Sequence, residues 1–147
     1  MTKILKNGIF VFTLLVIASL LQGCADADDE FVHSANTISQ MACSVSHSGT
    51  GYLGTIYEFD KDGNILGTDF TQEQAEGGYG LIIFEIPKSQ QDDFDLTNVY
   101  LTATLTYDEF ITPSLSGRFD ITGDGIIIAV KSGVNTVRYY RVRGEYQ

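Results

Sequence analysis

Apolar and polar residues alternate with a period of two along most of the chain from residue 36 onwards. Successive side chains of a β-strand point to opposite faces, so this period predicts strands with one face in a core. The clearest case is residues 99–106, where apolar residues face one way and Tyr100 and three threonines face the other. Similar alternation is found in residues 41–45, 53–59, 126–130 and 137–142.

Residues 79–86 are apolar on both faces, which predicts a central strand covered on both sides. Turn residues separate the strand-like runs. Asp62-Gly63 is the pair favoured by a two-residue type I′ hairpin turn, because both turn residues need positive φ. No window has the period of an amphipathic helix of normal length, and at most Ser89 to Phe94 close a single helical turn. The sequence therefore predicts a β-sandwich of about seven strands, with a small β-barrel as the alternative.

The first 24 residues follow a different pattern. Lys3 and Lys6 precede an apolar run over residues 9–21, which ends in Leu21-Gln22-Gly23-Cys24. The run is shorter than the roughly 20 residues that a membrane-spanning helix needs. This arrangement resembles the signal peptide and lipobox of a bacterial lipoprotein. The resemblance implies cleavage before Cys24, acylation of that cysteine, and a lipid anchor in the outer membrane.

Residues 25–30 carry four carboxylates, which predicts a solvated, extended tether after the lipid. The run is similar to the acidic export signal of many Bacteroidetes surface lipoproteins, which implies exposure at the cell surface; a plain flexible spacer is the alternative. The predicted organisation is a signal peptide in residues 1–23, a lipidated acidic tether in 24–35 and a β-sandwich domain in 36–147.

The chain has nine basic and nineteen acidic residues, which give a net charge of −10. Removal of residues 1–23 takes away two of the lysines and makes the balance more negative. Such a charge repels the phosphate backbone, so nucleic acid is not an expected partner. With Cys24 lipidated, Cys43 has no disulfide partner, and its alternating surroundings predict a small core residue rather than a nucleophile.

The second half of the chain carries another resemblance. A strand ending in Pro87 precedes an acidic loop, the run 99–106, the segment Ile111-Thr112-Pro113-Ser114 and two final strands around Ser132-Gly133. This order is similar to that of immunoglobulin-like domains in surface lipoproteins of gut Bacteroidetes. The resemblance implies an immunoglobulin-like β-sandwich whose last two strands form a hairpin. It implies no particular ligand, because such domains serve varied roles.

Candidate catalytic and metal-binding residues are few. Residues 60–64 have acidic side chains at alternate positions, but Ile65 and Thr71 stand where an EF-hand loop needs glycine and an acidic ligand. A hairpin turn is therefore the favoured interpretation. Serines flank His47, yet no orienting carboxylate or nucleophile elbow accompanies them. We expect no enzyme activity, no metal and no cofactor.

Aromatic residues are better candidates for binding. Tyr100 lies on the threonine-rich face of its strand, where an exposed ring can stack on a sugar or a protein partner. In Tyr139-Tyr140 one ring must face the core and the other outward, and the sequence leaves both phases open. Tyr100 and Tyr140 are the candidate ligand-binding residues. The predicted function is a non-catalytic binding or accessory module for glycans or protein partners; the alternative is a structural subunit of a multi-protein cell-envelope assembly.

A Cys24→Ala variant tests the predicted anchor. It removes the only thiol that the lipobox offers for acylation, so we expect loss of lipidation and of cleavage at this site. Detergent partitioning and the mass of the processed chain measure both effects. Correct cleavage of the variant together with retention in the detergent phase would contradict the lipoprotein interpretation.

Overall fold

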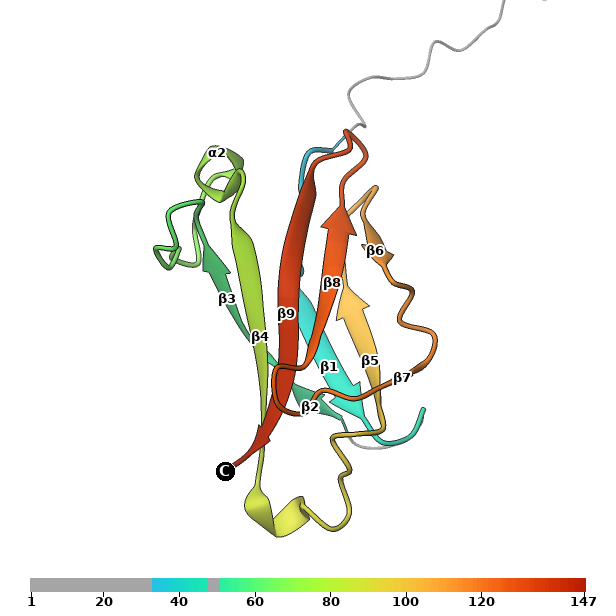
Figure 1. The fold of residues 1–147 in the computed structure, drawn as a ribbon. Coiled ribbons are helices and arrows are strands. Elements are labelled where there is room, and N and C mark those ends of the chain that lie inside the picture. The colour runs from blue at the N-terminus through green and yellow to red at the C-terminus, as the bar shows by residue number, and fades with distance from the viewer. Residues whose placement is uncertain (1–32, 48–50) are drawn as a thin grey trace, which may run out of the picture. The chain divides into compact units, whose positions relative to one another are not determined.

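Two β-sheets pack face to face in this protein (Figure 1). The structure is a computed structural model that describes residues 33–47 and 51–147, all within one compact unit, Val32–Gln147. The predicted signal peptide, Cys24 and most of the predicted tether lie outside the described residues. The predicted all-β sandwich is confirmed. The barrel alternative is wrong, because the strands form two separate sheets.

The four-stranded sheet has the order β2-β1-β5-β7, with bounds Tyr52–Leu53, Gln40–Ser44, Val99–Thr104 and Arg118–Phe119. The five-stranded sheet has the order β3-β4-β9-β8-β6, with bounds Thr55–Phe59, Tyr79–Ile86, Val137–Tyr146, Ile126–Lys131 and Phe110–Thr112. Strands β8 and β9 are antiparallel neighbours, as expected for a final hairpin, whereas β4 and β9 run parallel. Figure 1 shows β4, β9 and β8 in front of β1 and β5.

Among the described residues, helical structure is limited to single turns at the two ends of β4. The helix α2, Gln72–Ala75, begins at a capping box in which Thr71 and Gln74 bond reciprocally, and the 3₁₀ turn η2 spans Lys88–Gln90. The turn η2 and a hydrogen bond from Phe94 N to Gln90 O occupy the segment where the sequence predicts one helical turn. In the part of the chain that the structure describes, no helix has the length and apolar character needed to cross a membrane.

The core lies between the inner faces of the sheets and contains alternate residues of the long strands. Its fully buried members include Met41, Ile82, Phe84, Leu101, Ile128, Val130 and Val142. In β5, Val99 and Leu101 are buried, Ala103 is half-buried and the threonines are exposed, which confirms the predicted facing of that strand. Cys43 is also buried, as predicted.

The predicted strand over residues 53–59 is broken at Gly54. The chain leaves the four-stranded sheet after β2 and enters the five-stranded sheet at β3. A Cβ on Gly54 would press on the side chains of Ile82 and Phe84, so glycine permits this close crossing over the core. The described part of the chain has nine strands instead of about seven, and the break at Gly54 and the short strands β6 and β7 contribute to the larger number.

The turn after β3 also differs from the prediction. Strand β3 continues into a single bridge between Phe59 and Ile65, so five residues form the loop. Gly63 has φ of 84° but Asp62 is not in the left-handed region, which rules out a type I′ turn. The Asp60 carboxylate accepts hydrogen bonds from the backbone N–H groups of Asp62 and Asn64, at 2.9 and 2.8 Å. These bonds replace the tight turn with a wider loop closed on Asp60.

A buried polar cluster lies on the inner face of the five-stranded sheet. Arg138 is 1% exposed, and its Nη1 lies 2.9 Å from Oε2 of Glu58. The hydroxyl of Tyr140 donates to the other carboxylate oxygen, Oε1, at 2.5 Å. The same hydroxyl accepts a hydrogen bond of 3.1 Å from the backbone N–H of Ile38, just before β1. The cluster therefore joins β3, β9 and the segment that enters the four-stranded sheet.

Arg138 also satisfies the backbone at one end of the sheet. Its guanidinium donates to the carbonyl oxygens of Phe59, Tyr79 and Ala75. These three groups end β3, begin β4 and end α2, so one side chain ties three elements together. Removing it would leave the buried Glu58 carboxylate without its counter-charge and several buried carbonyl oxygens without a donor.

We expect Arg138→Met to lower the free energy of unfolding by about 3–5 kcal/mol, because Glu58 loses its buried counter-charge. The double variant Glu58→Gln, Arg138→Met should lose less than the sum of the two single variants, because each single variant leaves one unpaired buried charge and the double variant leaves none. Urea denaturation of residues 31–147 measures these differences.

Lys61→Met is the matched control, because it removes a cation from the exposed ion pair with Asp62. Its effect should stay within about 0.5 kcal/mol. An Arg138→Met variant as stable as this control would contradict the structural role of the cluster.

Candidate functional site

An exposed apolar patch lies on the outer face of the five-stranded sheet, over β4 and the start of β9. The prediction that β4 is covered on both sides is wrong: its inner residues are buried, but Tyr79 and Leu81 point outward and no other described element covers them. Tyr79 is 48% exposed and Tyr139, its register partner on β9, is 57% exposed. A large apolar surface left open on a monomer is typical of a binding site.

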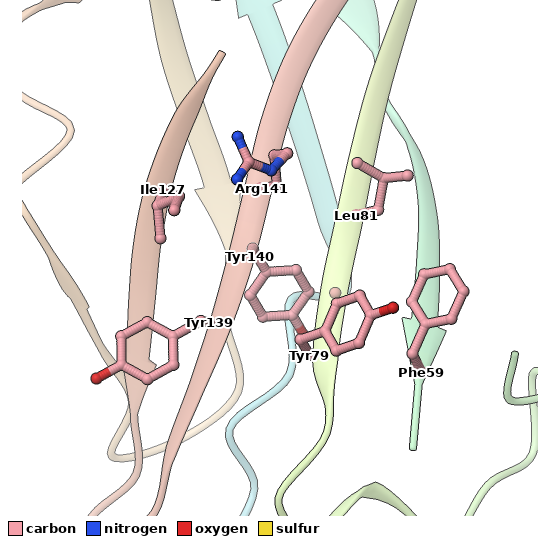
Figure 2. A pocket seen from close by; sticks show the side chains of 8 residues that line it. Phe59, Tyr79, Leu81, Ile127, Tyr139, Tyr140 and Arg141 are labelled. Carbon is pink, nitrogen blue, oxygen red and sulfur yellow. The ribbon is translucent and has the colours of Figure 1, made fainter. Parts of the chain in front are cut away.

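The exposed residues surround a shallow hollow that we name the aromatic groove. It has a volume of about 370 Å³ and is lined by Phe59, Tyr79, Gly80, Leu81, Ile127, Tyr139, Tyr140 and Arg141. Figure 2 shows the ring of Tyr139 extending over β8 and that of Tyr79 extending towards Phe59, so the two rings point away from each other. The groove thus runs across β4 and β9 between two aromatic walls.

The rings of Phe59 and Tyr79 stack on each other. Their centroids are 4.8 Å apart and their planes differ by 12°. Phe59 and Tyr79 are direct neighbours across the β3–β4 ladder, which places their side chains on the same face at this spacing. Each ring fixes the other, so this wall of the groove is preorganised.

Arg141 extends from β9 beside Ile127 and Leu81 (Figure 2). It is exposed, and its Nη1 donates to the carbonyl oxygen of Asp124 at 2.8 Å, in the turn that precedes β8. This single bond orients the guanidinium at the edge of the groove. The arrangement offers flat apolar surfaces and one cationic donor group to a ligand.

Tyr140 does not bind at the surface, so its prediction as a ligand-binding residue needs correction. Its ring has 0% exposure, points into the core and packs against Gly80 of β4, where a Cβ would overlap it. Burial and the Glu58 carboxylate raise the pKa of the Tyr140 hydroxyl, which keeps it protonated as a donor. The outward ring of the pair is Tyr139.

Burial raises the pKa of the Glu58 carboxyl as well, and the hydrogen bond from Tyr140 and the charge of Arg138 oppose this rise. The two donors thus counteract the burial, which disfavours the charged form of Glu58. Both carboxylate oxygens of Glu58 already accept hydrogen bonds from Arg138 and Tyr140. The cluster therefore stabilises the fold and is not free to bind a ligand.

Tyr100, the other predicted ligand-binding residue, lies on the outer face of the four-stranded sheet, so the structure does not bring it together with Tyr140. Its half-buried ring already has two neighbours. The His47 ring lies 3.9 Å away between centroids, and the guanidinium carbon of Arg118 lies 4.3 Å from the centre of the Tyr100 ring. A binding role for Tyr100 stays a prediction, with less free ring surface than Tyr139 has.

Sequence reasoning did not choose Tyr79 or Tyr139 as binding residues and left the facing of Tyr139 open, although two features of the sequence bear on both residues. Residues 79–86 are apolar on both faces, and a second apolar face is either covered or available for binding. For β9, the residue that decides which face points inward is Arg138. Arg138 can face the core only if a buried acidic side chain pairs with it. Glu58 is that partner, eighty residues earlier in the chain.

The other candidate reactive or metal-binding side chains, Cys43 and Asp60, have structural roles. Burial raises the pKa of the Cys43 thiol to about 12, so it is a thiol and not a thiolate at neutral pH. Hydrogen bonds from Asn64 hold the pKa of Asp60 below its ordinary value and occupy its carboxylate. Within residues 33–47 and 51–147, no group of three or more His, Cys, Asp or Glu side chains is placed to hold a metal ion.

No protein-family model, no curated protein and no solved structure matches this chain. The resemblance to immunoglobulin-like lipoprotein domains therefore stays a prediction.

Gly80→Ala tests the packing beneath the groove. The new Cβ would overlap the buried Tyr140 ring, so we expect a loss of about 1–3 kcal/mol in the free energy of unfolding. Gly117→Ala is the control, because a Cβ there meets no atom within 4 Å and its φ is not positive. The control should change stability by less than about 1 kcal/mol. Equal effects in urea denaturation would contradict the close contact of Gly80 with Tyr140.

Proposed function

We propose that this chain is a lipid-anchored protein of the outer membrane, exposed at the cell surface, that binds sugar rings without catalysis in the aromatic groove. The observation that carries the proposal is the exposed apolar patch on the outer face of β4 and β9, in which Tyr79 and Tyr139 are about half exposed. The anchor and the location come from the lipobox ending in Cys24 and the acidic run after it.

The shape and size of the groove favour a small ring-shaped ligand. Its volume of about 370 Å³ is in the range of small-molecule sites, which start at roughly 300 Å³. Exposed aromatic rings stack well on the C–H face of a pyranose, because that face is apolar while the hydroxyl groups remain in water. The rigid Phe59–Tyr79 stack reduces the entropy lost when such a ligand binds.

The composition of the groove supports binding rather than catalysis. Among the described residues that line it, there is no carboxylate, histidine, serine or cysteine to act as a nucleophile or general base. Glu58 lies on the opposite side of the sheet and is held by Arg138 and Tyr140.

The alternative, a structural subunit recognised through strand edges, has less support. The edge strands β2, β6 and β7 are two or three residues long. The remaining edge strand, β3, is partly covered by its own loop, since the backbone N–H of Leu66 donates to the carbonyl oxygen of Glu58 at 2.7 Å. Short or covered edges offer little ladder to an added strand.

A glycan array probed with residues 31–147 tests the proposal. We expect a reproducible glycan hit that Tyr139→Ala weakens at least about ten-fold, because the variant removes one aromatic wall. Tyr107→Ala is the matched control: this ring is 77% exposed but lies outside the groove, so binding should persist.

A parallel pull-down from envelope extract separates the alternatives. A blank array with a specific envelope partner would replace the glycan with a protein ligand. A glycan hit that survives Tyr139→Ala would remove the aromatic groove as its site.

A further inference from the structure

Arg141 is the single charged residue among the described residues that line the aromatic groove. Its one hydrogen bond within the described part of the chain is from Nη1 to the backbone of Asp124, and no carboxylate there lies within 4.0 Å of it. A guanidinium has five N–H donors in a planar fork. Most donors of this exposed side chain are therefore available to a ligand.

Four other cations of the domain already have partners. Lys61 pairs with Asp62, Arg138 with Glu58 and Arg143 with Glu145, and Arg118 lies over the ring of Tyr100. Lys88 and Lys131 form no ion pair among the described residues either, but they do not line the groove. The chain has nineteen acidic and only nine basic residues. None of the described residues that line the groove is acidic. The local charge of the groove is thus opposite to the net charge of −10. This contrast is complementary to a negatively charged ligand group.

Arg141 is placed where it can contact a ligand ring that stacks on the aromatic walls of the groove. Figure 2 places its guanidinium next to Ile127, on the side of the groove away from the rings of Tyr79 and Tyr139. A ligand resting on the aromatic walls could direct one substituent towards this fork. Carboxylates and sulfates accept two parallel hydrogen bonds from such a fork, and the apolar surroundings strengthen these bonds.

We propose that the aromatic groove selects sugar rings that carry an oxyanion, a carboxylate or a sulfate, and that Arg141 recognises this group. The inference rests on the proposed function, because it names the ligand class of the same groove. The ligand is a short glycan with isolated charges rather than a polyanion. The overall charge of −10 repels a polyanion, and a groove of about 370 Å³ holds one or two rings.

The test compares three trisaccharides that differ only at the terminal ring: galactose, galacturonate and galactose 6-sulfate. Their affinities for the processed, lipid-anchored chain in phosphatidylcholine nanodiscs are measured by titration calorimetry. We expect at least one acidic trisaccharide to bind about ten-fold more tightly than the neutral one, and the stronger acidic ligand identifies the oxyanion. Arg141→Gln should abolish this difference between the acidic and the neutral trisaccharides.

Arg143→Gln is the matched control, because Arg143 follows on the same face of β9 but does not line the groove. This variant should keep the preference for the acidic trisaccharide. Equal affinities for all three ligands, or equal effects of the two arginine variants, would overturn the inference and leave the proposed function in place. Failure of all three trisaccharides to bind would contradict the proposed function and the inference together.

Discussion

The buried contact between Glu58 and Arg138 decides which side chains face outward in the five-stranded sheet. Side chains alternate between faces, so an inward Glu58 turns Phe59 outward on β3. An inward Arg138 and Tyr140 likewise turn Tyr139 and Arg141 outward on β9. The aromatic groove is therefore a consequence of a polar interaction on the opposite side of the sheet. A shift of either strand by one residue would bury the groove and expose the ion pair.

The same contact explains why a polar cluster is tolerated in this core. Removing a carboxylate and a guanidinium from water is unfavourable, and a buried pair contributes little net stability compared with apolar residues. Here the donors and acceptors reach beyond the pair, because Tyr140 bonds both Glu58 and Ile38, and Arg138 bonds three backbone carbonyls. Most of the buried polar groups are thereby satisfied, and the register of β3, β4 and β9 is specified together.

The alternation of apolar and polar residues was sufficient to predict the fold class. It was not sufficient to predict, for every strand, which side chains point into the core. Residues 99–106 have apolar residues on one side and threonines on the other, so their orientation followed from the sequence. In β9 the two faces are equally mixed, with Arg138 and Tyr140 on one side and Tyr139 and Arg141 on the other. Only a partner distant in the chain, Glu58, distinguishes them, and alternation carries no information about such a contact.

An exposed apolar patch can cause two copies of a domain to associate, because pairing buries the patch. The charge distribution opposes this outcome. The net charge of −10 repels copies of the chain from one another, while the groove itself contains no carboxylate among its described lining residues. Repulsion that acts between whole chains is weak against a small ligand, because a single ring carries at most one or two charges. Acidic residues outside the groove can thus keep the face free of other copies and open to a ring-sized ligand, and the cation of Arg141 favours a ligand of opposite charge.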